Sequence, residues 1–298
     1  MAILIDENTT VLVQGITGRE GTARTRTMVD YGTRILCGVT PGRGGTKVWE
    51  VPVYNSVNEA VDAYGVIDAS VVFVPGPLVK SAVVETLEAG IRFLVVPAER
   101  VPLHDSLEMI AMARRKNARI LGPGSLGIIS AGKALMGWIG GTEEFAREVF
   151  KPGSVGVISR SGGQTTTVAW SITHSGLGIT TALHVGAEPV LGSNFAELLT
   201  LFQDDPQTKL VVMFGEIGTV AEEEAAEAVR EGKFNKPLVA YIAGRSLPAG
   251  VRFSHASAII ERGRGTAESK VKALKEAKAY VVDKPQEIPE TVRRILER

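Results

Sequence analysis

The chain has 298 residues, and its 33 basic residues (Lys and Arg) balance 33 acidic ones, so the formal net charge is zero. A balanced charge favours neither nucleic acid nor an anionic membrane as a partner, and no apolar run reaches the roughly twenty residues of a transmembrane helix. The first residues lack the basic segment of a signal peptide, and the single cysteine, Cys37, cannot form an internal disulfide. We therefore expect a cytoplasmic protein, and the length predicts about two domains.

The first part of the chain alternates short β-rich runs with segments of helical periodicity. The expected strands cover residues 10–14, 34–39, 69–74, 93–96 and 119–121, and the expected helices cover 56–64 and 78–90. Strands that alternate with helices predict a parallel, doubly wound sheet. A turn-forming run at residues 122–127 closes this unit, so we place the first domain at residues 1–128.

A second unit of the same type follows and fills residues 129–298. Its expected strands cover residues 154–159, 209–214 and 237–242, and its expected helices cover 165–175, 220–231, 267–277 and 290–298. No low-complexity linker separates the two units, so they should pack closely together. The predicted fold class is therefore α/β, with two domains that each contain a mainly parallel sheet.

Two glycine-rich loops follow neighbouring strands of the first unit. Residues 15–21 have the spacing Gly-x-x-Gly-x-x-Gly directly before a helix, and residues 41–45 (Pro-Gly-Arg-Gly-Gly) follow the second strand. Glycine lets the backbone approach a ligand, and the amides at a helix start favour phosphate. Each loop alone is also compatible with a tight turn that binds nothing. Together they indicate a nucleotide-bearing ligand across the carboxyl ends of the strands.

A third loop of this kind connects a strand of the second unit to a helix, at residues 159–167 (Ser-Arg-Ser-Gly-Gly-Gln-Thr-Thr-Thr). The positive end of that helix would stabilise a phosphoryl or carboxylate group. A helix start capped by Ser or Thr is the simpler alternative. The double glycine at residues 162 and 163 favours an anion site.

His255 is one of four histidines, and small residues flank it on both sides, so a bulky group such as a phosphoryl can approach its ring. Glu216 lies upstream in the run Gly-Glu-Ile-Gly at residues 215–218. A carboxylate from a second loop could hold one ring nitrogen and leave the other as a nucleophile. The alternative for this run is a buried histidine packed among small residues at a turn.

Taken in order, these segments make the chain resemble the α subunit of succinyl-CoA synthetase along essentially its whole length. The matching runs are Val-Gln-Gly-Ile-Thr-Gly at 13–18, Gly-Val-Thr-Pro-Gly-Arg-Gly-Gly at 38–45, Gly-Ser-Asn-Phe at 192–195, Asp-Pro-Gln-Thr at 205–208, Gly-Glu-Ile-Gly at 215–218 and His-Ala-Ser-Ala-Ile-Ile at 255–260. Within the ADP-forming acyl-CoA synthetases, the resemblance implies a Rossmann-like CoA-binding domain followed by a flavodoxin-like ligase domain. It also implies a phosphohistidine at His255, with Glu216 as its carboxylate partner.

The same resemblance places the CoA phosphates beside the first glycine loop. The residues that it implies for CoA are Thr17, Gly18, Arg19 and Glu20, then Pro41 and Arg43 of the second loop, then Pro97, Ala98 and Glu99 on the adenine side. Arg43 stands where the family usually has Lys, which keeps the charge. The family has Ile-Thr-Glu at residues 97–99, so only Glu99 matches there.

The acyl site departs from the succinyl-CoA synthetase pattern. That family has Ser-Arg-Ser-Gly-Thr-Leu-Thr-Tyr-Glu, with the Tyr assigned to substrate, whereas this chain has Gly163 after Gly162 and Thr166 in place of the tyrosine. The Ser-Arg-Ser-Gly-Gly run and the longer approach at residues 140–155 are instead similar to ATP-citrate lyase. Loss of the tyrosine and gain of a glycine would open room for a tricarboxylate, so we expect Ser161, Gly162, Gly163 and Thr166 to bind substrate or phosphate.

No citrate-synthase-like domain follows the ligase module in this sequence, so the expected protein is the small subunit of a citryl-CoA synthetase, which forms citryl-CoA from citrate, CoA and ATP. No P-loop is evident. The resemblance therefore implies an ATP-grasp-containing large (β-type) subunit that binds most of the ATP and Mg²⁺, and we assign no metal site to this chain.

Three other interpretations stay open from the sequence. The nearest is a succinyl-CoA or malyl-CoA synthetase subunit with an altered acyl pocket. A CoA-binding regulator without catalytic activity is another, although the presence of both His255 and Glu216 argues against it. A glycine-rich NAD-dependent dehydrogenase fits less well, because Thr40 and Pro41 stand where an acidic residue would bind the ribose.

Overall fold

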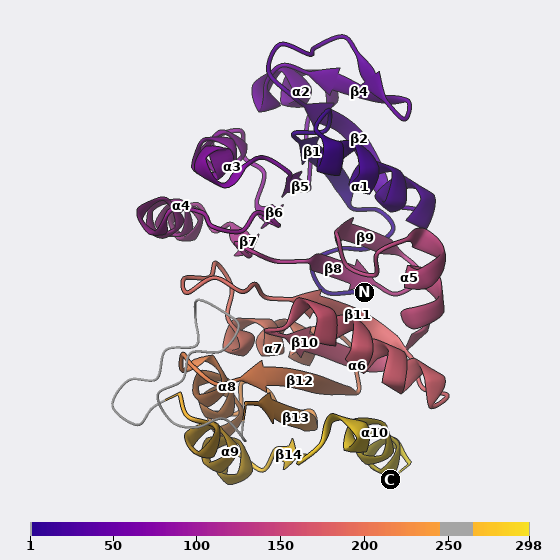
Figure 1. Ribbon diagram of the computed structural model, residues 1–298, viewed down its shortest axis with the longest axis vertical. Helices are drawn as coiled ribbons and strands as arrows, with labels where there is room; N and C mark the ends of the chain where they lie inside the picture. The colour runs from indigo at the N-terminus through magenta and orange to yellow at the C-terminus, as the bar shows by residue number, and fades with distance from the viewer. Residues whose placement is uncertain (1, 245–264, 298) are drawn as a thin grey trace.

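The computed structural model describes residues 2–244 and 265–297 and contains two α/β units stacked along the long axis of the molecule (Figure 1). The first unit, in indigo and violet, forms the upper half of the view, and the second, in pink to yellow, forms the lower half. Helices lie on either side of each sheet, as they do in doubly wound folds. The predicted α/β fold class is confirmed.

Among the described residues, the first sheet has seven strands in the order β3-β4-β2-β1-β5-β6-β7. They are β1 (Thr10–Gln14), β2 (Arg34–Val39), β3 (Lys47–Val48), β4 (Val51–Tyr54), β5 (Ala69–Val72), β6 (Phe93–Val95) and β7 (Arg119–Leu121). All neighbouring pairs are parallel except the β3–β4 hairpin. Numbered along the chain, the parallel strands have the spatial order 3-2-1-4-5-6, which is that of a Rossmann sheet.

Helices connect the strands of this first unit. They are α1 (Arg19–Tyr31), α2 (Val57–Tyr64), the 3-10 turn η1 (Gly76–Leu78), α3 (Val79–Glu88) and α4 (Leu103–Arg115). Local chemistry sets several of their ends. The Ser56 side chain accepts a hydrogen bond from the backbone N–H of Glu59 and caps α2, and Gly32 ends α1 with a φ of 107°, a left-handed conformation that favours glycine.

The second sheet also has seven strands within the described residues, in the order β14-β13-β12-β10-β11-β8-β9. They are β8 (Gly127–Ser130), β9 (Ala134–Gly137), β10 (Pro152–Ser159), β11 (Ile179–His184), β12 (Leu210–Glu216), β13 (Leu238–Ala243) and β14 (Tyr280–Val281). β8 is antiparallel to β9 and β11, and the other pairs are parallel. The parallel strands have the order 2-1-3-4-5 of a flavodoxin-like sheet.

The helices of the second unit cover both faces of this sheet. They are α5 (Glu143–Val149), α6 (Gly162–His174), α7 (Phe195–Asp204), α8 (Ala221–Arg230), α9 (Ala267–Glu276), the 3-10 turn η2 (Pro285–Glu287) and α10 (Ile288–Leu296). Polar side chains begin three of them, because Thr142, Asn194 and Thr266 each accept a hydrogen bond from a first-turn backbone N–H.

The strands predicted from the sequence are all present, with small differences at their ends. The strand expected at residues 69–74 ends at Val72, and the helix expected at 165–175 already begins at Gly162, because the double glycine forms the first turn of α6. The structure adds elements that were not predicted, among them β8, β9, β11, α4 and α7. β8 and β9 are only four residues long each, and glycines at residues 127, 132 and 137 interrupt their apolar runs.

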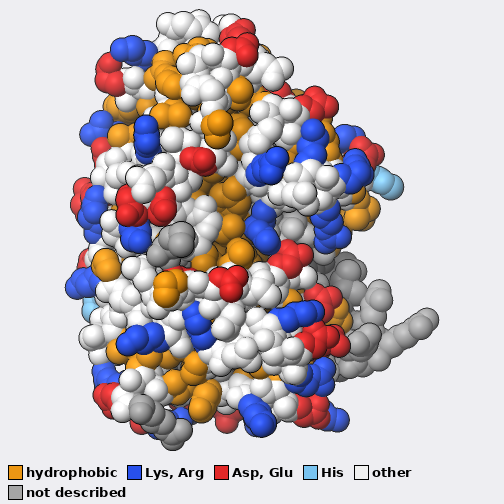
Figure 2. Space-filling view, turned by 180° about the vertical axis from the view of Figure 1, so that it is seen from behind, with side chains coloured by type: hydrophobic (Ala, Val, Ile, Leu, Met, Phe, Trp, Pro, Cys, Tyr) orange, Lys and Arg blue, Asp and Glu red, His pale blue; other side chains and the backbone are white. Residues whose placement is uncertain are grey.

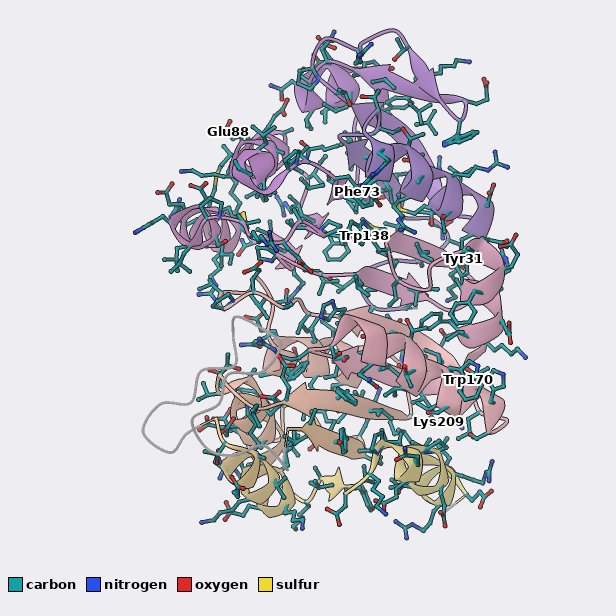
Figure 3. All side chains as sticks on the ribbon, in the orientation of Figure 1. Tyr31, Phe73, Glu88, Trp138, Trp170 and Lys209 are labelled. Atoms are coloured by element: carbon teal, nitrogen blue, oxygen red, sulfur yellow. The ribbon has the colours of Figure 1, made fainter. Side chains whose placement is uncertain are left out.

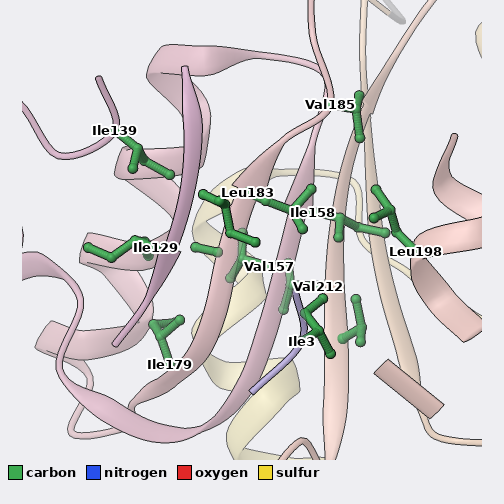
Figure 4. Packing of buried hydrophobic residues seen from close by; sticks show 14 of the residues in the cluster. Ile3, Ile129, Ile139, Val157, Ile158, Ile179, Leu183, Val185, Leu198 and Val212 are labelled. Carbon is green, nitrogen blue, oxygen red and sulfur yellow. The ribbon is translucent and has the colours of Figure 1, made fainter. Parts of the chain in front are cut away.

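One contiguous hydrophobic core includes buried side chains from both units. Val13 of β1 and Val95 of β6 belong to the same cluster as Ile158 of β10 and Leu183 of β11. Figure 4 shows the part of this core around the second sheet, where Ile158, Leu183 and Val212 lie close together. The two units therefore pack closely, as the lack of a linker between them predicted.

The chain passes from the first sheet to the second just before β8. All four residues of β8 pair with β11, so this strand belongs to the second sheet. The predicted division between residues 128 and 129 falls inside β8, and the domain limits stay a prediction. A direct link across the junction joins the backbone N–H of Arg100 to Oε1 of Glu188 at 2.6 Å.

The surface carries charges of both signs. Acidic and basic side chains are interspersed over the face shown in Figure 2, in keeping with the zero net charge. No helix within residues 2–244 or 265–297 has the length and apolar content needed to cross a bilayer.

Candidate active site

The first candidate site lies where the strand order of the first sheet reverses, between β1 and β5. Open α/β sheets bind ligands at such a point, outside the carboxyl ends of the strands. A cleft of about 420 Å³ occupies this edge, and residues at the ends of β1, β2 and β5 line it. Gln14 lies at its base with 2% of its surface exposed, and its side-chain amide donates to Oγ1 of Thr86 at 2.6 Å.

Glycines shape the turn between β1 and α1. Gly15 has a φ of 73°, and a Cβ on it would collide with the carbonyl group of Phe73. A Cβ on Gly21 would collide with the carbonyl oxygen of Gly15, so the helix packs against the turn only with glycine there. Gly18 is the N-cap of α1 and has no side chain to bond the first-turn amides. The start of α1 can therefore receive a phosphate.

The structure places some of the residues predicted for CoA in this cleft and others beside it. Thr17, Gly18 and Pro41 line the cleft. Arg19 directly follows Gly18 and has a side chain that is 94% exposed, with its Nε 3.5 Å from Oε1 of Glu20. Arg43 is exposed. Its loop is held by Oδ1 of Asn55, which accepts from the backbone N–H of Gly42 at 3.0 Å and of Gly44 at 2.9 Å.

The third predicted group, residues 97–99, follows β6 and is not among the residues that line the cleft. Pro97 is buried, Ala98 is partly buried and Glu99 is exposed. The carbonyl oxygen of Ala98 accepts a hydrogen bond from the backbone N–H of Gly124 at 2.9 Å. This segment therefore contacts the junction between the two units, and its place at the adenine side of CoA stays a prediction.

The end of β5 and the start of α3 form a wall of the cleft that the sequence interpretation missed. Phe73, Leu78 and Glu85 belong to this wall. The strand predicted at residues 69–74 was the available signal, because its carboxyl end lies at the same edge as those of β1 and β2. Phe73 stacks on Trp138 of the second unit, with ring centroids 6.5 Å apart (Figure 3). The second unit therefore supports one wall of the cleft.

The second candidate site lies at the corresponding point of the second sheet, between β10 and β12. The turn after β10 leads into α6, whose N-cap, Ser161, makes no side-chain capping bond. The two glycines of this turn have different surroundings. A Cβ on Gly162 would lie 2.6 Å from Cδ1 of Leu126, whereas a Cβ on Gly163 would meet nothing within 4 Å. Packing therefore requires Gly162, and open space lies beside Gly163.

His184, at the end of β11, fixes this turn against the junction. Its Nδ1 accepts from the backbone N–H of Leu126 at 2.9 Å, so the proton is on Nε2, which donates to the carbonyl oxygen of Arg160 at 3.0 Å. The imidazole is 3% exposed. His184 therefore has a structural role in joining the start of α6 to the run before β8.

Arg160 and Glu216 bring the turn before α6 and the end of β12 together. Nε of Arg160 is 3.5 Å from Oε1 of Glu216, and the two side chains are 3% and 15% exposed. Nε and Nη2 of Arg160 are buried, and neither has a hydrogen-bond acceptor among residues 2–244 and 265–297. Arg160 also faces a cleft of about 240 Å³ beside the starts of α7 and α8, which Arg114 and Asn194 help to line. No role for Arg160 was predicted from the sequence.

His255 lies outside the described residues, but the structure shows where the stretch that contains it leaves and rejoins the rest of the chain. β13 pairs with β12 so that Ala243 is opposite Glu216. On the far side of the stretch, the carbonyl oxygen of Gly265 accepts from the backbone N–H of Gly218 at 2.8 Å. The described residues that flank the stretch, Ala243 and Gly265, therefore both adjoin the Gly-Glu-Ile-Gly run.

Family models match both units of the chain. The CoA binding domain matches residues 6–100, and the CoA-ligase model matches residues 158–280. The first match covers the cleft at β1, and the second covers α6 and Glu216. The CoA-binding assignment of the first unit is thus confirmed.

Relatives of this chain are subunits of ADP-forming CoA ligases. Succinate–CoA ligase [ADP-forming] subunit alpha 2 of Archaeoglobus fulgidus is 48% identical over 99% of this chain and 100% of its own length. The ADP-forming sulfoacetate-CoA ligase subunit SqwL of Acholeplasma sp is 44% identical over 97% of this chain and 96% of its own length.

A solved ATP citrate lyase from Methanosaeta concilii, in complex with (3S)-citryl-CoA, has a TM-score of 0.88 and 30% identity over 99% of this chain. This chain spans 50% of that lyase chain.

A CoA-binding Rossmann unit joined to a CoA-ligase unit defines an ADP-forming acid–thiol ligase. The chain belongs to the succinyl-CoA synthetase α-subunit family of these enzymes.

Proposed function

We propose that the chain is the small, α-type subunit of a citryl-CoA synthetase, which forms citryl-CoA from citrate, CoA and ATP. The observation that carries this proposal is the open position at Gly163 in the first turn of α6, where succinyl-CoA synthetases have threonine. Similarity to ATP citrate lyases solved with citryl-CoA, or with citrate and coenzyme A, supports the choice of acid.

The reaction consists of three transfers. A ring nitrogen of His255 takes the γ-phosphoryl group of ATP and ADP leaves. A carboxylate oxygen of citrate then takes the phosphoryl group and restores the imidazole. In the last step the sulfur of CoA, having lost its proton, attacks the acyl carbon of citryl phosphate and displaces inorganic phosphate. Dividing one difficult activation into easier steps is the logic of covalent catalysis.

The described residues support these steps by fixed charges and dipoles. Glu216 holds the second ring nitrogen of His255 and keeps its nucleophilic nitrogen in place. The first-turn amides of α6, next to Ser161 and Gly163, stabilise phosphoryl and carboxylate oxygens, and the buried guanidinium of Arg160 adds positive charge nearby. Thr166 lies one turn further along α6 and borders the acyl group.

The first cleft suits both the pantetheine arm and the phosphates of CoA. The apolar side chains at the ends of β2 and β5 suit the pantetheine arm, and the start of α1 suits the phosphates. The exposed cations Arg19 and Arg43 adjoin this start in the two glycine loops and reach the phosphates, with Glu20 beside them. Residues 97–99 meet the adenine side.

ATP and Mg²⁺ bind mainly to an ATP-grasp-containing large (β-type) subunit, which phosphorylates His255. The names of the relatives support a two-subunit enzyme, because they are α subunits of ADP-forming ligases with nearly the same length as this chain.

A second candidate is a succinyl-CoA synthetase α subunit, which the 48% identity to the Archaeoglobus fulgidus protein favours. The 44% identity to a sulfoacetate-CoA ligase subunit shows that relatives this similar differ in their acid. Malate stays a further alternative from the sequence.

The experiment that tests the acid is reconstitution with the large subunit, followed by a hydroxamate assay with citrate, succinate, malate and sulfoacetate at equal concentrations. The citrate proposal requires citrate to give the highest rate. A higher rate with succinate would replace it by the second candidate.

A further inference from the structure

Behind Glu216 lies a cluster of buried charges that takes no direct part in the proposed transfers. Lys270 of α9 and Glu222 of α8 are both 0% exposed and form an ion pair. Nζ of Lys270 also donates to Oε2 of Glu223 and to the carbonyl oxygen of Thr219, each at 3.1 Å. The three N–H donors of the ammonium group therefore all have acceptors.

The ion pair is connected by a hydrogen bond to the backbone of Glu216, the candidate catalytic residue. One carboxylate oxygen of Glu222 binds Lys270, and the other, Oε1, accepts from the backbone N–H of Glu216 at 3.0 Å. The neighbouring Gly215 leaves room for this carboxylate, because a Cβ there would lie 2.6 Å from the same oxygen. The first glycine of the Gly-Glu-Ile-Gly run is thus explained by the approach of Glu222.

The cluster also holds the point where the chain returns from the stretch that contains His255. Oε1 of Glu223 accepts from the backbone N–H of Gly265 at 3.1 Å and from the Ser269 hydroxyl at 2.7 Å. Gly265 in turn accepts from the N–H of Gly218 at 2.8 Å. The backbone amides of Glu216 and Gly265 are therefore bound by Glu222 and Glu223, two adjacent residues at the start of α8.

A buried ion pair contributes little net stability compared with apolar side chains of similar volume, so its place in this fold calls for another explanation. We propose that Lys270 and Glu222 are positioning residues for phosphoryl transfer: they fix the backbone of Glu216, and through it the carboxylate that lies 3.5 Å from Arg160. The inference rests on the proposed role of Glu216 toward His255.

The first test compares two glycine substitutions in the complex with the large subunit. Gly215→Ala pushes the carboxylate of Glu222 away from the Glu216 amide. Gly156→Ala is the matched control, because Gly156 lies in β10 of the same sheet and its Cβ would lie 2.5 Å from the ring of Phe202 in α7. Both variants should melt at lower temperature. Only Gly215→Ala should slow acid-labile labelling from γ-labelled ATP, by at least about tenfold, with the KM for CoA unchanged.

If both glycine variants label at the same rate, the positioning role is wrong. A second comparison applies when Gly215→Ala does not fold. Lys270→Met combined with Glu222→Leu removes both the charges and the acceptor for the Glu216 amide, whereas Lys270→Met with Glu222→Gln keeps an acceptor oxygen. The Gln pair should label at least about fivefold faster than the Leu pair. Equal rates at equal melting temperature would overturn the inference.

Glu216→Gln separates this inference from the proposed function. Wild-type labelling in Glu216→Gln would contradict the role of Glu216 itself. Slow labelling in Glu216→Gln, together with unaffected Gly215→Ala, would leave that role intact and refute only the contribution of Lys270 and Glu222.

Discussion

The two units place their charges differently at corresponding points of their sheets. Beside the β1–β5 switch point, Arg19 has a side chain that is 94% exposed, and Arg43 is exposed as well. At the β10–β12 switch point, Arg160 is 3% exposed and faces Glu216, and Lys270 behind it is 0% exposed. The first edge is an open cleft with cations around it, and the second is a fixed internal network.

This difference matches two kinds of task. An exposed cation adjusts to a ligand that binds and leaves whole, and salt screens its effect. A buried charge in a low-dielectric surrounding is held in one orientation and acts strongly on charge that develops during a reaction. We therefore expect substitutions at the second site to change rates more than affinities, and those at the first site to change affinities.

The largest expected effect is at the proposed phosphoryl carrier. His255→Ala should abolish both thioester formation and acid-labile labelling from γ-labelled ATP, because the proposed mechanism passes the phosphoryl group through this histidine. His174→Ala is the control, because His174 is exposed at the end of α6. Labelling that persists in His255→Ala would mean that His255 is not the phosphoryl carrier, and would contradict the catalytic role proposed for the second site.

The next effect concerns the acid. Gly163→Thr with Thr166→Tyr restores the succinyl-CoA synthetase pattern in the open space of α6. Loss of an amide–carboxylate contact should lower the kcat/KM for citrate relative to succinate by roughly ten- to hundredfold. Initial rates with both acids measure the ratio. An equal loss for citrate and succinate would mean that this turn does not select the acid.

A smaller effect is expected at the first site. Arg43→Gln should weaken CoA binding to the isolated subunit by about five- to tenfold in calorimetry, because a charge-assisted phosphate contact is lost. Arg34→Gln removes the same charge at the exposed, opposite end of β2 and serves as the control. Equal affinities for the two variants would argue against a phosphate contact. ATP should not bind until the large subunit is added.

The smallest effect is on stability. Burial alone would raise the pKa of Glu223, but the charge of Lys270 and hydrogen bonds from Ser269, Lys270 and Gly265 lower it below its ordinary value. A lowered pKa stabilises the folded state above the unfolded pKa, and this contribution is lost as the pH falls through the folded pKa. Glu223→Gln should therefore melt a few degrees below wild type at neutral pH, with the gap closing below about pH 4.

Calorimetric melting temperatures across this pH range test that prediction. Glu276→Gln, at the end of α9, is the control, because its carboxylate is 52% exposed and lies 3.9 Å from Lys272. A gap between wild type and Glu223→Gln that stays constant down to pH 3 would mean that the charge of Glu223 is not responsible.

Local patterns were enough to predict most of the strands and the sheet edges at which the two candidate sites lie. β1, β10 and β12 are apolar runs that end in glycine-containing turns, so their type and direction follow from neighbouring residues. Glycine spacing located the loops, but it could not separate Gly162, which packing requires, from Gly163, which faces open space. That difference depends on Leu126, which lies far away in the chain, just before β8.

The contacts that fix the second site could not be predicted, because they join residues far apart in the chain. His184 binds Leu126, 58 positions away, and Lys270 binds Glu222, 48 positions away. Periodic patterns in a single sequence report local structure and do not show which distant residues are in contact. Within their own segments, His184, Lys270 and Glu222 show no pattern that would mark them as contact residues. Only the packing of the folded chain brings these residues together.

The antiparallel position of β8 has a consequence for exchanging parts between relatives. A hybrid that takes its first 128 residues from one parent would contain a β8 strand made of residues from both parents. The two strands that pair with β8, β9 and β11, would come from the second parent. A crossover between residues 121 and 122, directly after β7, takes all strands of the second sheet from the same parent. Hybrids made there should retain the acid preference of the second parent, whichever relative supplies the CoA cleft.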